Sequence, residues 1–223
     1  MNSNGKIIFV IGPPRSGSSM TAAFLNQCGA WGRIHGDVHH SGFHLNVVDR
    51  CLLLPNIERA SYLLDLAGTN LPGVPCPVEG LEAPDAVTRI TGALASVGWT
   101  GGTAVVRSHL ALPFVPSLNR QFTDAAFVFV HRDPLDACDS VRRTGWMPLR
   151  EDRDFWYSYI SRFNTEMTRF SQLPDVRGFT VYPQHLINGN NHEIMEVSRR
   201  LGLNWTPEAE TLFQSVKREA YHG

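Results

Sequence analysis

The residues most able to do chemistry stand in the segment GPPRSGSSM, at positions 12–20, directly after the apolar run IIFVI. Gly12 and Gly17 are separated by four residues, and serines follow the second glycine. A loop that leaves a buried strand and opens a helix points backbone N–H groups and the positive end of the helix dipole at one place. The spacing therefore predicts an anion site, with Arg15 as a charged donor inside the loop.

This loop departs from the pattern of P-loops that bind ATP or GTP. Those loops read G-x-x-x-x-G-K-[ST], where the lysine reaches the phosphates and the hydroxyl holds magnesium. Here Ser18 occupies the lysine position, and Ser16 and Ser19 add further hydroxyl donors. The segment taken alone leaves two interpretations open, an anion site that does without the lysine and a purely structural turn.

A second polar segment lies in AFVFVHRDPLDACDSVRR, where an apolar strand stops and a helix starts. Asp133 before Pro134 is a strong helix start, because Asp caps free N–H groups and proline suits the first helical position. Arg132 therefore lies at the carboxyl end of a strand, where open α/β sheets place their ligands. A salt bridge is the alternative role for Arg132, and magnesium binding is the weaker alternative for Asp133.

Three more polar residues follow on the same predicted helix. Ser140 comes six residues after Pro134, so its hydroxyl faces the same ligand only if the helix runs alongside that ligand. We interpret Arg142 and Arg143 as solvated surface charge.

The elements that must position these residues are predicted by the pattern of apolar residues. The predicted strands are 6–11, 103–108, 125–130 and 178–182. The predicted helices are 18–28, 44–66, 84–97, 134–143, 151–172, 190–202 and 207–217. Alternation of this kind favours an α/β chain, a three-layer doubly wound fold with a central parallel sheet of about four to five strands, similar to P-loop NTPases.

Size and charge limit the classes of protein. At 223 residues and 43% hydrophobic, the chain suits one domain over 1–223. A net charge of -1 gives no overall field for nucleic acid or an anionic membrane. The N-terminus predicts neither a signal peptide nor a membrane span, and four distant cysteines, Cys28, Cys51, Cys76 and Cys138, suggest free thiols in a reducing cytosol. We therefore expect a cytoplasmic protein.

Two other clusters have ordinary explanations. The segment 33–47 contains four histidines that could bind metal on a helix, but glycines interrupt that helix; the histidines are His35, His39, His40 and His44. We therefore expect a loop there and no metal. In helix 151–172 the aromatic residues recur at helical spacing, as a core stripe does; they are Phe155, Tyr159, Phe163 and Phe170.

With both anion motifs described, the sequence resembles the sulfotransferases that use 3′-phosphoadenosine 5′-phosphosulfate (PAPS). The stretch Pro14-Arg15-Ser16-Gly17-Ser18-Ser19-Met20 looks like their 5′-phosphosulfate loop, P-[KR]-S-G-[ST]-[ST]-x. The stretch from Arg132 to Ser140, with an interval of eight residues, looks like their 3′-phosphate motif.

The resemblance implies a role for each matched residue. The loop backbone with its serines, Ser16, Ser18 and Ser19, would bind the 5′-phosphosulfate. Arg132 and Ser140 would bind the 3′-phosphate. Arg15 would stand where many members carry a lysine that acts on the bridging oxygen, and Met20 where a tryptophan often stacks on adenine. The late R-K-G phosphate loop of the family has no visible counterpart.

A third segment adds to the resemblance. Val105-Val106-Arg107-Ser108-His109-Leu110 is similar to a K-T-H-L segment whose histidine is the catalytic base and whose lysine approaches the sulfate. His109 would then be the base and Arg107 the cation. The stretch that begins at Tyr182 resembles the family's Y-E-D-L strand end, which implies that Tyr182 contacts the nucleotide.

These observations predict a sulfotransferase that moves a sulfuryl group from PAPS to a hydroxyl or amine by in-line displacement and releases PAP. Sulfuryl transfer needs positioning, a base and nearby cations, and it depends less on a metal than phosphoryl transfer does. The acceptor would be a small molecule or a glycan, and the unmatched region 29–100 is expected to form an insertion on the acceptor side. A P-loop kinase of nucleotides or small molecules and a non-catalytic nucleotide-binding module are the alternatives.

Overall fold

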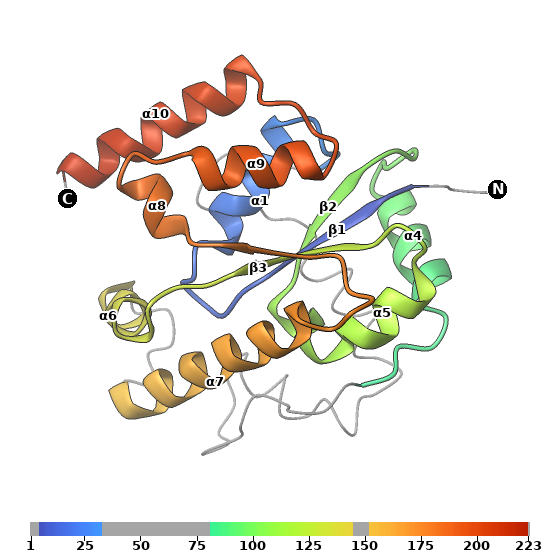
Figure 1. The fold of residues 1–223 in the computed structure, drawn as a ribbon, viewed down its shortest axis with the longest axis horizontal. Helices are drawn as coiled ribbons and strands as arrows, with labels where there is room; N and C mark the ends of the chain where they lie inside the picture. Colours follow the sequence, from blue (N-terminus) through green and yellow to red (C-terminus); the bar gives the residue numbers. More distant parts are fainter. Residues whose placement is uncertain (1–4, 33–80, 145–151, 223) are drawn as a thin grey trace.

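A parallel β-sheet organises the part of the chain that the computed structural model describes, residues 5–32, 81–144 and 152–222. Within these residues the sheet has four strands in the order β2-β1-β3-β4, and every neighbouring pair is parallel (Figure 1). The strands are β1 (Ile7–Ile11), β2 (Ala104–Arg107), β3 (Ala126–Val130) and β4 (Gly178–Val181). The predicted parallel α/β sheet is thus confirmed, with all four predicted strands.

Helices connect the strands and cover both faces of the sheet. Before β3 these are α1 (Ser18–Gln27), α4 (Ala86–Ser96), the 3-10 helix η3 (His109–Phe114) and α5 (Val115–Gln121). After β3 they are α6 (Pro134–Thr144), α7 (Arg153–Ser171), α8 (Pro183–Ile187), α9 (His192–Arg200) and α10 (Pro207–His222). Figure 1 shows α1, α8, α9 and α10 on one side of the sheet and α5 and α7 on the other.

The side chains of the strands contribute to two separate hydrophobic cores, one on each face of the sheet. In β1, Ile7, Phe9 and Ile11 pack with α4, α5 and α7, whereas Ile8 and Val10 pack with α1, α9 and α10. All residues of β1 and β3 are buried, as expected for strands that are covered on both faces. The predicted three-layer arrangement follows from these two cores.

Helix α7 shows the predicted aromatic stripe. Tyr159, Phe163 and Phe170 are buried in the core, and Phe155 packs against it while partly exposed. Trp156 is buried beside them, with its ring perpendicular to that of Tyr159 at a centroid distance of 5.9 Å. The stripe therefore anchors α7 to the sheet.

The main differences from the predicted elements concern short helices. The structure forms η3, α5 and α8, which the pattern of apolar residues did not predict because each is too short to show a full helical period. Ser108 starts η3, and its Oγ accepts a hydrogen bond from the Ala111 backbone N–H at 3.1 Å. The predicted helix 44–66 and the histidines at 35–44 lie outside the described residues.

Other general expectations are tested in part. Among the described cysteines, Cys28 and Cys138 are buried free thiols. No helix in the described ranges combines the length and apolarity needed to cross a membrane. Within the same ranges, no three His, Cys, Asp or Glu residues gather as a metal site would require.

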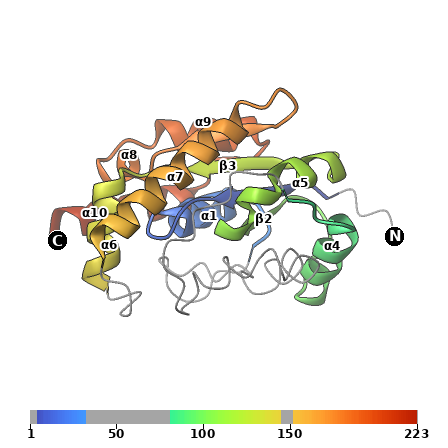
Figure 2. The same ribbon diagram turned by 90° about the horizontal axis from the view of Figure 1, so that it is seen from below.

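The parallel arrangement places four strand ends at one edge of the sheet. β1 leads there into residues 12–17, β2 into Ser108, β3 into His131 and β4 into Tyr182. Figure 2 shows α6, which follows β3, at the end of the molecule opposite α4 and the N-terminus. The polar segments singled out in the sequence therefore meet at this edge, as parallel strands predict.

Asp133 caps α6, as its place before Pro134 predicts. Its Oδ1 accepts hydrogen bonds from the backbone N–H groups of Leu135 at 2.9 Å and Asp136 at 3.2 Å. Both bonds engage N–H groups that have no acceptor inside the helix.

We predict that Asp133→Ala lowers the free energy of unfolding by about 1 kcal/mol, because two N–H groups lose their acceptor. Asp133→Asn, which keeps an acceptor oxygen, restores most of this stability. Urea denaturation of the three proteins, each with EDTA and with magnesium, measures the effect. A dependence on magnesium that is lost in both variants would contradict the capping role.

Candidate active site

The loop after β1 is shaped by two glycines. A Cβ at Gly12 would lie 2.5 Å from Ser16 Oγ and 2.9 Å from the Val130 carbonyl oxygen, so a side chain does not fit there. Gly17 has φ 93°, a left-handed conformation that favours glycine, and a Cβ there would lie 2.8 Å from the Pro183 side chain. The loop is thus held tightly between β3 on one side and the start of α8 on the other.

Ser16 presents a buried hydroxyl at the centre of this loop. The residue is 1% exposed, and its Oγ has no hydrogen-bond partner among the described residues. Buried polar atoms are normally paired, so this unpaired hydroxyl is a candidate contact for a ligand. Ser18 and Ser19 begin α1 directly behind it, where backbone N–H groups have no partner inside the helix.

Arg15 joins the loop to α6. It is exposed, and its φ of 62° is left-handed, a conformation that costs a non-glycine residue about 1–3 kcal/mol. Its Nε donates a hydrogen bond to Ser140 Oγ at 3.1 Å. Helix α6 therefore runs alongside the loop. This was the arrangement required for Ser140 to face the same ligand as the loop. Ser140 itself is 5% exposed.

Arg132 joins the loop to β3. Its Nη1 donates to the Arg15 backbone oxygen at 2.8 Å, which helps to hold the strained turn. Its Nε is buried and has no hydrogen-bond partner among the described residues. Arg15, Arg132 and Ser140, which come from two distant segments, thus form one hydrogen-bonded chain.

Asn164 is a contributor that sequence reasoning missed. It lies on α7, and its Nδ2 donates to the Arg132 backbone oxygen at 2.9 Å. Its Oδ1 is buried without a partner among the described residues. Asn164 directly follows Phe163 of the buried stripe. An uncharged polar residue beside such a stripe was the feature of the sequence that could have indicated a polar contact there. It fixes the turn that carries Arg132.

Electrostatics around Arg132 favour an anion. Burial lowers the pKa of Arg132; among the nearby charges, Asp136 and Asp133 raise it and the cations Arg15 and Arg143 lower it. The ordinary pKa of an arginine side chain is so far above neutral pH that Arg132 stays charged even when its pKa is lowered. Its burial and cationic neighbours mean that a bound anion would relieve the repulsion.

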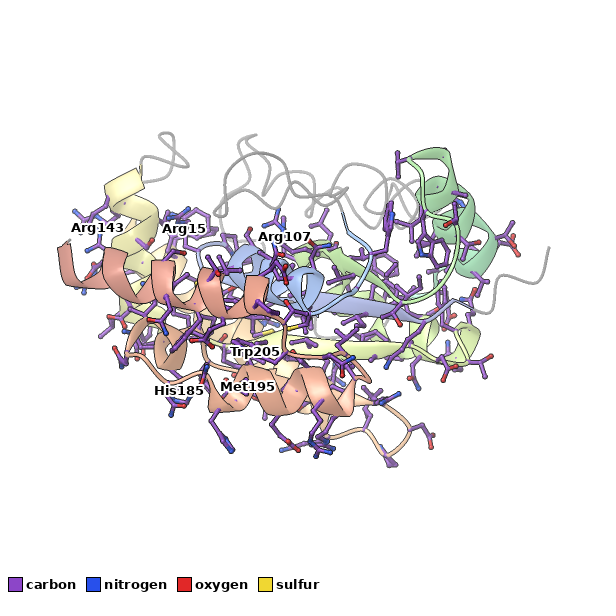
Figure 3. All side chains as sticks on the ribbon, turned by 90° about the horizontal axis from the view of Figure 1, so that it is seen from above. Arg15, Arg107, Arg143, His185, Met195 and Trp205 are labelled. Carbon is purple, nitrogen blue, oxygen red and sulfur yellow. The ribbon has the colours of Figure 1, made fainter. Side chains whose placement is uncertain are left out.

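Arg107 ends β2, the strand on the other side of β1, and His109 begins η3 two residues later. Both are half-buried. Burial, assisted by the charge of Arg107, lowers the pKa of His109 from 6.5 to about 4. His109 is therefore neutral at pH 7 and has a free lone pair that can accept a proton. Figure 3 shows Arg15 and Arg107 along the same side of the molecule.

Tyr182 follows β4, the outer strand on the side of the sheet away from β2. It is 44% exposed, and its ring centroid is 5.6 Å from that of His131 and 5.6 Å from that of His185. Glu193 accepts a hydrogen bond from the Tyr182 backbone N–H at 2.5 Å, and its other carboxylate oxygen lies 3.1 Å from His185 Nδ1. Two strands separate Tyr182 from Arg107 and His109, so the structure does not bring these predicted residues together.

Pro14, in the loop, and Met20, in the first turn of α1, differ in their exposure to solvent. Pro14 is half-buried at the start of the turn. Met20 is 9% exposed and belongs to the core between the sheet and α1. Its side chain thus packs inside the protein, and a contact between Met20 and a nucleotide stays a prediction.

Comparisons with known proteins agree with this geometry. A model described as the sulfotransferase family matches residues 8–207. The sulfotransferase domain from the Synechococcus PCC 7002 olefin synthase matches with a TM-score of 0.56 and 15% identity, covering 92% of this chain and 75% of that one. Sulfotransferase STF9 from Mycobacterium avium matches with a TM-score of 0.48 and 13% identity, covering 96% of this chain and 68% of that one. No curated protein matches the chain.

The structural similarity to the olefin synthase domain supports the α/β fold assignment of the described residues. The family match includes β1 from Ile8 onward, the other three strands, the loop at 12–20 and the segment 132–140. On this basis the chain belongs to the sulfotransferase family.

Proposed function

We propose that this chain transfers a sulfuryl group from PAPS to a hydroxyl or amine acceptor by in-line displacement. Membership of the family supports a sulfotransferase activity. The observation that carries the choice of donor is the chain of hydrogen bonds that ties Arg132 and Ser140 to the loop of Arg15. It brings the two segments that resemble the two phosphate-binding motifs of PAPS enzymes to one edge of the sheet.

The residues present fit a donor with two separate anionic ends. At the first end, the buried Ser16 hydroxyl and the first turn of α1 offer neutral donors to the phosphosulfate. At the second end, the unpaired Nε of Arg132 offers a charged donor to the 3′-phosphate, beside Ser140. When bound, PAPS supplies a sulfuryl group attached to phosphate through an anhydride oxygen.

Arg15 would stabilise negative charge that develops on the bridging oxygen. A guanidinium stays charged and can donate several hydrogen bonds, but it is a poor proton donor. The Nε of Arg15 already bonds to Ser140, which leaves the outer nitrogens of its guanidinium for the ligand. Arg107, at the end of β2, would add charge near the transferred group.

His109 would accept the proton of the acceptor. A base must be unprotonated before the reaction, and the low pKa of His109 ensures this at neutral pH. Its position at the start of η3, two residues after Arg107, puts the base and a cation on the same side of the loop. Tyr182, at the far edge of the sheet, would contact the nucleotide away from the reacting group.

We further propose one domain over 1–223, with an acceptor-side insertion within 29–100. The described residues on each side of 33–80 attach to the β2 side of the fold. The Trp31 N–H donates to the Thr103 oxygen at 2.6 Å, and the Leu81 N–H donates to the Pro113 oxygen of η3 at 2.6 Å. The first attachment is at the start of β2, and the second is on η3, the element that begins with His109, which supports an acceptor side there.

The direct test is transfer of radiolabelled sulfate from PAPS in the presence of EDTA. A panel of simple alcohols, amines and sugars serves as acceptors, and His109→Gln serves as the matched inactive protein. We expect a labelled product with at least one acceptor for the wild type alone. Binding of PAP without transfer to any acceptor would favour the non-catalytic nucleotide-binding module.

Replacement of Arg132 tests the 3′-phosphate end. Arg132→Ala should weaken PAP binding by about a hundredfold, because a partly buried charged donor is lost. Arg120→Ala is the matched control, because this arginine is on α5, is largely exposed and pairs with Glu82. Isothermal titration of both variants with PAP makes the comparison; similar affinities for PAP would remove Arg132 from the nucleotide site.

The pH dependence of turnover tests His109. Because only neutral His109 accepts a proton, a pKa of about 4 predicts that kcat/KM stays level as pH falls through 6.5 and declines only as pH approaches that pKa. His109→Gln should abolish transfer and leave PAP binding within about twofold. An acid limb centred near 6.5, or full turnover by His109→Gln, would show that His109 is not the base.

A further inference from the structure

Helix α6 carries two neighbouring arginines that face different directions. With 3.6 residues per turn, Arg143 lies about 60° from Ser140 around the helix axis, whereas Arg142 lies about 160° away. Asp136, one turn before Ser140, lies about 40° from it on the same side as Arg143. The helix geometry thus puts Arg143 next to the Ser140 hydroxyl that the loop contacts, and Arg142 on the far side.

Burial along α6 agrees with this arrangement. Ala137, Cys138 and Val141 are buried in the core, Ser140 stands at the margin of that buried face, and both arginines are exposed. Ser140 accepts the hydrogen bond of Arg15, so this margin is where α6 meets the loop. In Figure 3, Arg15 and Arg143 lie at the same end of the molecule, beside α6.

Arg143 also interacts electrostatically with Arg132. Arg143 is close enough for its charge to lower the pKa of Arg132, whereas Asp136 acts in the opposite direction. Arg142 has no such influence on Arg132. Arg15 contacts the Ser140 hydroxyl. The charges of Arg15 and Arg143 both act on Arg132, and two carboxylates, Asp136 and Asp133, act in the opposite direction.

The charge of a phosphate monoester, about -1.5 to -2 at pH 7, exceeds what one guanidinium neutralises. Arg132 is the cation assigned to that group, and Asp136 offsets part of its field. Arg15 bonds to Ser140 through its Nε, and in the proposed function its outer nitrogens serve the bridging oxygen at the other end of the donor. A second cation close to Ser140 would neutralise the remaining negative charge of the phosphate.

We propose that Arg143 is a further binding residue for the 3′-phosphate of the nucleotide and makes the site select 3′-phosphorylated nucleotides. This inference rests on the proposed use of PAPS. Arg132 and Ser140 would contact the phosphate from the strand end and the buried margin of α6, and Arg143 would contact it from the solvent side. Arg142, which has the same charge but the opposite direction, takes no part.

The test compares Arg143→Ala with Arg142→Ala. Both variants lose one positive charge from the last turn of α6, so effects on net charge and on the helix dipole are matched. Each protein is titrated with PAP and with adenosine 5′-monophosphate, which lacks the 3′-phosphate. Arg143→Lys keeps a charge at the same position, and thermal unfolding verifies that all variants are folded.

We expect Arg143→Ala to weaken PAP binding by about tenfold and to change binding of adenosine 5′-monophosphate by less than about twofold. Arg142→Ala should leave both affinities within about twofold, and Arg143→Lys should recover part of the loss for PAP. Equal losses for both nucleotides, or equal losses in both alanine variants, would overturn the assignment of Arg143. A wild type that binds PAP no better than adenosine 5′-monophosphate would overturn the proposed donor itself, and this inference with it.

Discussion

The parallel pairing of β1 with β2 and β3 is the constraint on which the rest of this structure depends. β1 is paired on both sides, with Val10 opposite Arg107 in β2 and opposite Val128 in β3. Because all strands run the same way, their carboxyl ends open at one edge, and the chain can place a loop, two arginines and a histidine there. Two buried cores fix the sheet between its helices, so the strand ends have little freedom to move apart.

The hydrogen bond from Arg132 to the Arg15 backbone links the loop after β1 to the end of β3. It holds a left-handed turn in the loop and aims a partly buried cation at the place where the two polar segments meet. Asn164 supports the same turn from α7. The proposed anion would offset the cost of holding several positive charges near each other, and a net charge of -1 is compatible with such a local site.

The sequence predicted those features that arise from local rules. Apolar runs revealed the four strands, and Asp133 before Pro134 revealed the start of α6, because strand burial and helix capping depend on neighbouring residues. The bond of Arg15 to Ser140, the support from Asn164 and the burial of Met20 were not predictable in this way, since each depends on how distant elements pack. The pKa of His109 depends similarly on burial in the folded chain. The roles of the site residues remain proposals that the geometry supports.

We propose that the loop and Arg132 hold a 3′-phosphorylated nucleotide without a metal. The most direct measurement is a calorimetric titration of the wild type with PAP in EDTA and with ATP in magnesium, under otherwise equal conditions. We predict that PAP binds in EDTA and that ATP with magnesium binds at least about a hundredfold more weakly, since the loop has Ser18 in place of the lysine. Tighter binding of ATP that depends on magnesium would contradict it and favour a kinase.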